Sequence, residues 1–135
     1  MIQRGDEMLE VFIEETLERL DSIESGLLTL EKLKECNPSL VNSIFRDAHS
    51  VKAGANLLKL KVIEELAHKL ENVLEMIRKC ELEASEMVTT ACLESLDKLR
   101  ELIDNIEHSE NISILLHTAM LEMAVKKTQE NAQGS

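Results

Sequence analysis

Residues 37–58 read NPSLVNSIFRDAHSVKAGANLL, and this stretch indicates how the whole chain folds. Asn37 is a favourable helix N-cap, and Pro38 suits the first helical position, where its missing N–H costs nothing. Apolar side chains then recur every three or four residues, as they do along the buried face of a helix. They are Val41, Ile44, Phe45, Ala48, Val51, Ala55 and Leu58. The pattern predicts a helix over residues 38–58 with one face in a core.

The same spacing occurs on both sides of this stretch. It predicts further helices over residues 6–33 (with Asp6 as N-cap), 61–80, from Ser85 to about 106, and 111–128. The predicted apolar face of the last helix is Ile112, Leu115, Leu116, Ala119 and Met123. Short connections make consecutive helices antiparallel. We therefore expect an all-α fold, an antiparallel up-down-up-down four-helix bundle with an additional C-terminal fifth helix over residues 1–128, followed by a disordered tail over 129–135.

Composition limits the classes of function. The formal net charge of −11 disfavours binding to nucleic acid or to an anionic membrane surface. No apolar run approaches the roughly 18 residues of a membrane span, and residues 1–5 lack the apolar core of a signal peptide. Cys36, Cys80 and Cys92 are odd in number and form no C-x-x-C pair, which is typical of a reducing compartment. These features predict a cytoplasmic protein.

One histidine in the helix over 38–58 has the surroundings of a reactive group. His49 lies at the edge of the apolar face, with the small residues Ser50, Ala53 and Gly54 around it. Because Gly within a helix costs about 1 kcal/mol relative to Ala, something is expected to approach closely there. An ordinary imidazole, with a pKa of about 6.5, is mostly unprotonated and nucleophilic near neutral pH. Lys52, one turn onward, would place a cation near the oxygens of a phosphoryl group on His49.

Two further sets of residues complete the predicted site. Arg46 and Asn56 share the outward face of His49, so we predict that they join Ser50, Ala53 and Gly54 in docking a partner. His68 and Glu71 lie one turn apart on a flank of the helix over 61–80. If this flank meets His49, Glu71 would accept a hydrogen bond from one ring nitrogen and leave the other as the nucleophile.

These motifs together resemble a known family. Ala48-His49-Ser50-Val51-Lys52, preceded by Phe45-Arg46, is similar to the phosphorylation motif of histidine-containing phosphotransfer (HPt) domains, above all the amino-terminal HPt domain of CheA-type chemotaxis histidine kinases. The run His68-x-x-Glu71-Asn72, which begins nineteen positions after His49, resembles a second segment of those domains. The sequence departs from the family pattern at two places: Ala53 stands where the family usually has Gly, and residues 57–59 also differ from the family. The resemblance implies that Lys52, His68 and Glu71 form a hydrogen-bond network around a phosphorylated His49.

The resemblance also implies a function. A kinase ATP-binding domain, which binds ATP and Mg²⁺ itself, would phosphorylate His49, and an aspartate of a response-regulator receiver domain would then take the phosphoryl group. The domain would need no cofactor, would have no activity alone and would be a monomer in isolation. It could belong to a chemotaxis kinase, to a hybrid kinase, or be a free-standing phosphorelay protein. The remoter alternatives are an adaptor bundle without chemistry and a carboxylate-bridged metal bundle, for which Glu65-x-x-His68 supplies one element.

Overall fold

The computed structural model describes residues 5–33 and 37–133. The described chain forms five α-helices and one short 3₁₀-helix, and it contains no strand. Their bounds are α1 Glu7–Leu33, α2 Pro38–Leu57, α3 Lys61–Arg78, α4 Glu86–Asp104, η1 Ile106–Asn111 and α5 Leu115–Gln133. The predicted all-α class is confirmed.

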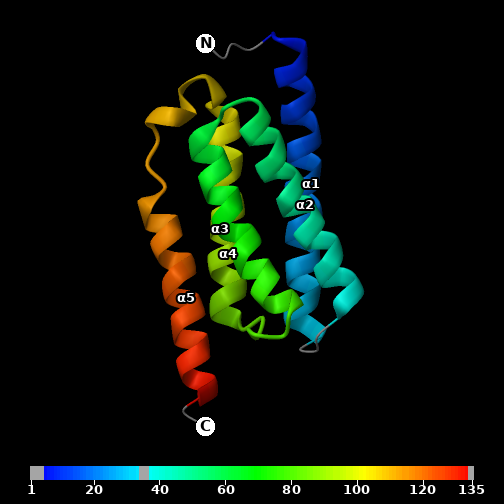
Figure 1. Ribbon diagram of the computed structural model, residues 1–135, viewed down its shortest axis with the longest axis vertical. Helices are drawn as coiled ribbons and strands as arrows, with labels where there is room; N and C mark the ends of the chain where they lie inside the picture. Colours follow the sequence, from blue (N-terminus) through cyan, green and yellow to red (C-terminus); the bar gives the residue numbers. More distant parts are fainter. Residues whose placement is uncertain (1–4, 34–36, 134–135) are drawn as a thin grey trace.

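Helices α1 to α4 run alternately up and down, and each packs against the next (Figure 1). Contacts between α1 and α4 close the ring of four, and α5 covers the outer side of α3 and α4. The predicted four-helix bundle with a fifth helix is therefore confirmed. The most extensive contact joins α2 to α3, the two helices that carry the predicted site.

The predicted helix starts are found with their capping bonds. Asp6 Oδ1 accepts a hydrogen bond from the Met8 amide at 2.9 Å, at the start of α1. Asn37 Oδ1 accepts one from Leu40 at 3.1 Å, with Pro38 in the first turn, and Ser85 Oγ accepts one from Val88 at 3.2 Å. Each side chain satisfies an amide that the helix itself leaves without a partner.

The apolar faces of α1 to α4 meet in one core. Its largest fully buried members are Leu9, Leu20, Ile23, Leu27, Ile44, Leu60, Ile63, Leu66, Leu70, Leu74, Leu96 and Leu99. Cys92 lies among them, and burial raises the pKa of its thiol to about 12, so it stays a neutral packing group. Cys80 is exposed, whereas Cys36 lies outside the described residues.

The fifth helix differs from the prediction in start and in buried face. Residues 106–111 form η1, Ile112 is extended, and α5 begins only at Leu115. The buried side chains of α5 are Leu121, Ala124 and Thr128, while Leu115 and Met123 are exposed. Two residues of a helix turn through about 200°, so Leu121 faces opposite to Ala119. The predicted face is wrong for the helix itself, because Leu116 and Ala119 also point to solvent. Its remaining member, Ile112, lies before the helix and packs partly against the core.

The predicted disordered tail is also revised by the structure. Helix α5 continues to Gln133, past the predicted limit of the bundle at residue 128. Thr128 is buried, and its hydroxyl lies 2.7 Å from the hydroxyl of Ser85 at the start of α4. This contact fixes the last turns of α5 against the bundle. Residues 1–4 and the predicted tail residues Gly134 and Ser135 lie outside the described residues.

The turn between α2 and α3 sets the register of the two helices that matter most. Lys59 adopts a left-handed backbone (φ 60°), and the Leu60 amide donates to the Ala55 carbonyl at 2.8 Å. The carboxylate of Glu110, from η1, then accepts hydrogen bonds from the Lys61 and Val62 amides at 2.8 and 3.1 Å. A residue distant in sequence thus caps α3. Among the described residues, no helix has the length and apolar character needed to cross a membrane.

Candidate functional site

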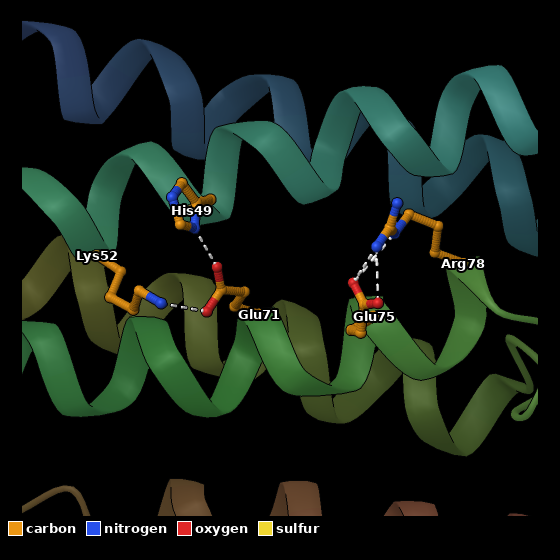
Figure 2. Close-up of polar contacts among 5 residues, drawn as sticks. All are labelled: His49, Lys52, Glu71, Glu75 and Arg78. Atoms are coloured by element: carbon orange, nitrogen blue, oxygen red, sulfur yellow. Dashed lines mark hydrogen bonds and ion pairs between the residues drawn. The ribbon is translucent and has the colours of Figure 1, made fainter.

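His49 and Glu71 face each other across the seam between α2 and α3 (Figure 2). His49 Nδ1 lies 2.5 Å from Glu71 Oε2. The two side chains differ sharply in accessibility, because the imidazole is 57% exposed and the carboxylate only 8%. A buried carboxylate therefore fixes one edge of a ring whose other edge remains open to solvent.

Lys52 bonds to the same carboxylate from one turn further along α2. Its Nζ lies 2.7 Å from Glu71 Oε1. Burial on its own would raise the pKa of Glu71, but the hydrogen bonds and charges of Lys52 and His49 outweigh it and lower that pKa below its usual value. Glu71 is thus ionised and can only accept hydrogen bonds. The proton of the bond to His49 must then lie on Nδ1, which leaves the lone pair of the neutral ring on Nε2.

His49 borders a groove of about 550 Å³ between α2 and α3. The groove is lined by Phe45, Arg46, His49, Ser50, Glu71, Asn72 and Glu75. The Phe45 ring stacks on the imidazole, with 6.3 Å between ring centroids and 23° between ring planes. Offset aromatic pairs have this separation, so His49 has support from an aromatic ring as well as from Glu71.

Three of the four predicted catalytic residues are joined in this way: His49, Lys52 and Glu71. His68 lies on α3 one turn before Glu71, but its side chain is exposed. Within the part of the chain that is described, it forms no hydrogen bond or ion pair with the other three. The structure thus leaves His68 outside the predicted network, and its role stays a prediction.

The predicted docking residues take several positions. Arg46 and Ser50 line the groove, and Ala53 is exposed one turn beyond His49. Asn56 is bonded to α3, since its Nδ2 donates to Glu64 Oε2 at 2.7 Å. A Cβ on Gly54 would lie 2.9 Å from the Phe12 ring of α1. The close approach that Gly54 permits is therefore made by its own chain, and a role of Gly54 in docking a partner stays a prediction.

Two polar residues of α3 beside this site were not predicted. Arg78 donates from Nε and Nη2 to the Glu75 carboxylate, over distances of 2.7–3.0 Å (Figure 2). Its guanidinium lies 4.6 Å from the Phe45 ring centroid. Their spacing from Glu71 in the sequence could have identified them. Glu75 and Arg78 follow it by four and seven residues and so share its face of the helix.

The lowered pKa of Glu71 predicts how the stability of the protein depends on pH. The pKa is lower in the folded chain than the ordinary 4.5, so the folded state binds fewer protons between those two values. The carboxylate then stabilises the fold above about pH 4.5, and this contribution is lost as the pH falls through the folded-state pKa. Urea unfolding should show a larger free-energy difference between the wild-type protein and Glu71→Gln at about pH 7 than at about pH 3. An equal difference at both would contradict the assignment.

The described residues do not support the alternative of a metal bundle. In residues 5–33 and 37–133, no group of three or more His, Cys, Asp and Glu side chains is arranged to hold a metal ion. Glu65 and His68, which supplied the single E-x-x-H element, are both exposed on α3. Within the described part of the chain, the side chains near them therefore do not complete a metal site.

Comparison with known proteins agrees with this geometry. The Hpt domain family matches residues 7–111. The chain is 34% identical over 101 residues to the chemotaxis protein CheA of Listeria monocytogenes serovar 1/2a, covering 75% of this chain and 16% of that protein. It is 37% identical over 97 residues to the CheA of Rhizobium meliloti, covering 72% of this chain and 13% of that protein. The chain thus spans only a small part of these relatives.

Among solved structures, the fold is similar to the phosphorylated P1 domain of CheA3 in complex with CheY6 from R. sphaeroides. The TM-score is 0.77, with 22% sequence identity, and the match covers 91% of this chain and 98% of that one. The structure thus holds a histidine by a buried glutamate on the seam of a helical bundle. Both residues lie within the stretch, residues 7–111, that the family matches. The chain belongs to the Hpt domain family and is a histidine phosphotransfer domain.

Proposed function

We propose that His49 accepts a phosphoryl group from ATP bound to a kinase domain and donates it to an aspartate of a response-regulator receiver domain in chemotaxis. The observation that carries the proposal is the orientation of His49. Its Nδ1 is held by buried Glu71, and its ring is more than half exposed beside an open groove. This arrangement presents Nε2, with its lone pair, to an incoming phosphoryl group.

The chemistry follows from that orientation. Nε2 attacks the γ-phosphorus of ATP, an N–P bond forms, and the bond from phosphorus to the leaving oxygen of ADP breaks. The ring gains positive charge in this step, and the Glu71 carboxylate on Nδ1 stabilises that charge. In the second step a carboxylate oxygen of the receiver attacks phosphorus in line, and the electron pair of the N–P bond returns to Nε2. Such transfers depend mainly on positioning and charge stabilisation.

Names of the relatives support the partners proposed here. The matched curated proteins are chemotaxis proteins named CheA, and the matched solved domain is phosphorylated and in complex with CheY6. By analogy, the kinase ATP-binding domain would lie elsewhere in a longer protein and would bind ATP and Mg²⁺ itself. Both phosphoryl transfers would take place in the cytoplasm, where ATP and receiver domains are available.

Substitution of Glu71 tests the mechanism within the site. In Glu71→Gln, the Lys52 ammonium has only donors, so it favours the amide oxygen and turns the amide NH₂ toward His49. That bond favours the tautomer with its proton on Nε2, which removes the nucleophilic lone pair. We expect phosphorylation to slow by about 10–100-fold, as for other groups that orient a reactive histidine. The rate should be measured with an isolated CheA-type kinase core and labelled ATP.

Glu64→Gln is the matched control, because Glu64 also bonds across from α3 to α2, but its partner Asn56 lies seven residues beyond His49 along α2. It should leave the rate within about twofold, the effect expected of a substitution outside the site. Equal rates for Glu71→Gln and the wild-type protein would remove Glu71 from the mechanism.

Phosphotransfer profiling tests the function as a whole. The chain is incubated with a CheA-type kinase core that lacks its own HPt domain, together with labelled ATP, and is then separated and mixed with candidate receiver domains. We expect acid-labile label on the chain, followed by rapid transfer to chemotaxis receivers and slower transfer to other receivers. If no label is acquired, the proposal fails. If label moves only to receivers of other pathways, the assignment to chemotaxis fails.

A further inference from the structure

Helices α2 and α3 present two matching rows of side chains along their seam. Phe45, His49 and Lys52 follow one another at spacings of four and three residues on α2. On α3, Glu71, Glu75 and Arg78 have the same spacings and the opposite direction (Figure 2). The Glu71 end of the second row meets His49 and Lys52, and its Arg78 end meets Phe45.

Arg78 is held in place by its own helix. Three hydrogen bonds fix its guanidinium to the Glu75 carboxylate, which lines the groove beside His49. These bonds lower the pKa of Glu75 and raise that of Arg78, so both side chains remain charged. A fork of this kind fixes the plane of the guanidinium as well as its position.

The fixed guanidinium lies against Phe45, which in turn lies against His49. The guanidinium carbon is 4.6 Å from the Phe45 ring centroid, within the range of a cation–π contact. The same ring stacks on the imidazole of His49. A half-buried phenylalanine on an open groove has freedom to change rotamer unless something restrains it, and the guanidinium supplies that restraint.

We propose that Arg78, anchored by Glu75, holds the Phe45 ring against His49 and thereby orients the imidazole for phosphoryl transfer. The proposal rests on the proposed function, since it concerns how the same histidine reacts. Glu71 fixes one ring nitrogen, which leaves the imidazole able to swing about that bond. Contact with Phe45 restricts this motion and keeps Nε2 on the exposed side of the ring. Arg78 and Phe45 are positioning residues, because neither bonds to the transferred group.

Steady-state phosphorylation by a CheA-type kinase core tests this proposal, with the intact chain as the varied substrate. Phe45→Leu should lower kcat by about 2–12-fold, the rate equivalent of an aromatic pair. Arg78→Met should lower kcat by about 2–5-fold, the equivalent of an exposed cation–π contact. The KM for the chain should change by less than about twofold, because positioning affects the chemical step and not docking. Phe45→Tyr, which keeps the ring, should restore most of the rate.

The double variant distinguishes the proposed route from others. Because Arg78 acts through Phe45, Phe45→Leu/Arg78→Met should be no slower than Phe45→Leu alone. Nuclear magnetic resonance of the His49 ring, assigned by comparison with His49→Gln, should show that Arg78→Met changes the ring signals, which a purely structural role would leave unmoved. Circular dichroism establishes that each variant is folded.

Arg100→Met is the matched control, since Arg100 also bonds to several carboxylates (Asp21, Glu24 and Asp97) but at the α1–α4 side of the bundle. It should leave kcat and the His49 signals unchanged. Unchanged kcat in folded Phe45→Leu and Arg78→Met would overturn the proposal, and so would a rise in KM alone, which would indicate docking. Absence of label on the wild-type chain would instead refute the proposed function, so the two failures are distinguishable.

Discussion

His49→Gln is expected to reduce acid-labile phosphorylation of the chain to background. A glutamine amide is not a nucleophile, whereas its size is close to that of histidine and its NH₂ group can donate to the Glu71 carboxylate in place of Nδ1. The side chain is more than half exposed, so little core packing changes. The free energy of unfolding should therefore stay within about 0.5 kcal/mol of the wild-type value. Labelling with a kinase core and urea unfolding provide the two measurements.

A histidine elsewhere on α3 gives the control for this result. His68→Gln changes an exposed residue on α3 that forms no bond to His49 in the described chain, so label should be retained. Label that persists in His49→Gln and disappears in His68→Gln would move the acceptor to His68 and refute the assignment.

Leu70→Ala is expected to produce the largest loss of stability, about 2–5 kcal/mol, through a cavity in the core. Leu70 is 1% exposed and immediately precedes Glu71 on α3. Loss of its contacts loosens the helix that carries the carboxylate, in addition to removing buried apolar surface. Thermal unfolding should show a midpoint lower by about 7–18 °C.

Leu57→Ala is the matched control for this substitution. Leu57 is 71% exposed at the end of α2, so the same change in side chain creates no cavity. Its effect should stay within about 0.5 kcal/mol. A similar loss of stability in both variants would show that burial of Leu70 does not explain its effect.

Much of the bundle could be predicted because local signals and packing agree. Asp6, Asn37 and Ser85 cap α1, α2 and α4 where the apolar spacing begins, so propensity and hydrophobic pattern indicate the same boundaries. The predicted end of α3 was two residues too late. Cys80 adopts a left-handed backbone conformation (φ 61°) just after the helix. Helices often end in this way at Gly, but a cysteine does not predict it.

The fifth helix could not be predicted in the same way. Its sequence carries two competing apolar faces, one containing Leu115 and Met123 and the other containing Leu121 and Ala124. Only contact with α3 and α4 decides between them, and it selects the second. Two apolar residues before α5, the extended Ile112 and the buried Ile114, lie outside any helix. A prediction from apolar spacing assigns them to the helix all the same.

The contacts of the functional site were also predictable only in part. The pairing of His49 with Glu71 was predictable, because the spacing within each helix and an antiparallel packing bring the two together. The bond of Lys52 to Glu71 was implied only by the resemblance to HPt domains, because a lysine side chain is long enough to reach several acceptors and spacing alone does not choose among them. Arg78 was missed because its effect depends on Phe45, which the apolar pattern assigned to the core alone.

The Glu110 carboxylate has a practical consequence for anyone who shortens this protein. It bonds to two backbone amides at the start of α3, yet it lies beyond α4, the last helix of the four-membered ring. A fragment ended at Asp104 would keep every helix of that ring while exposing the first turn of α3 to fraying. Any minimal version must therefore extend through Asn111, which is also where the family match ends.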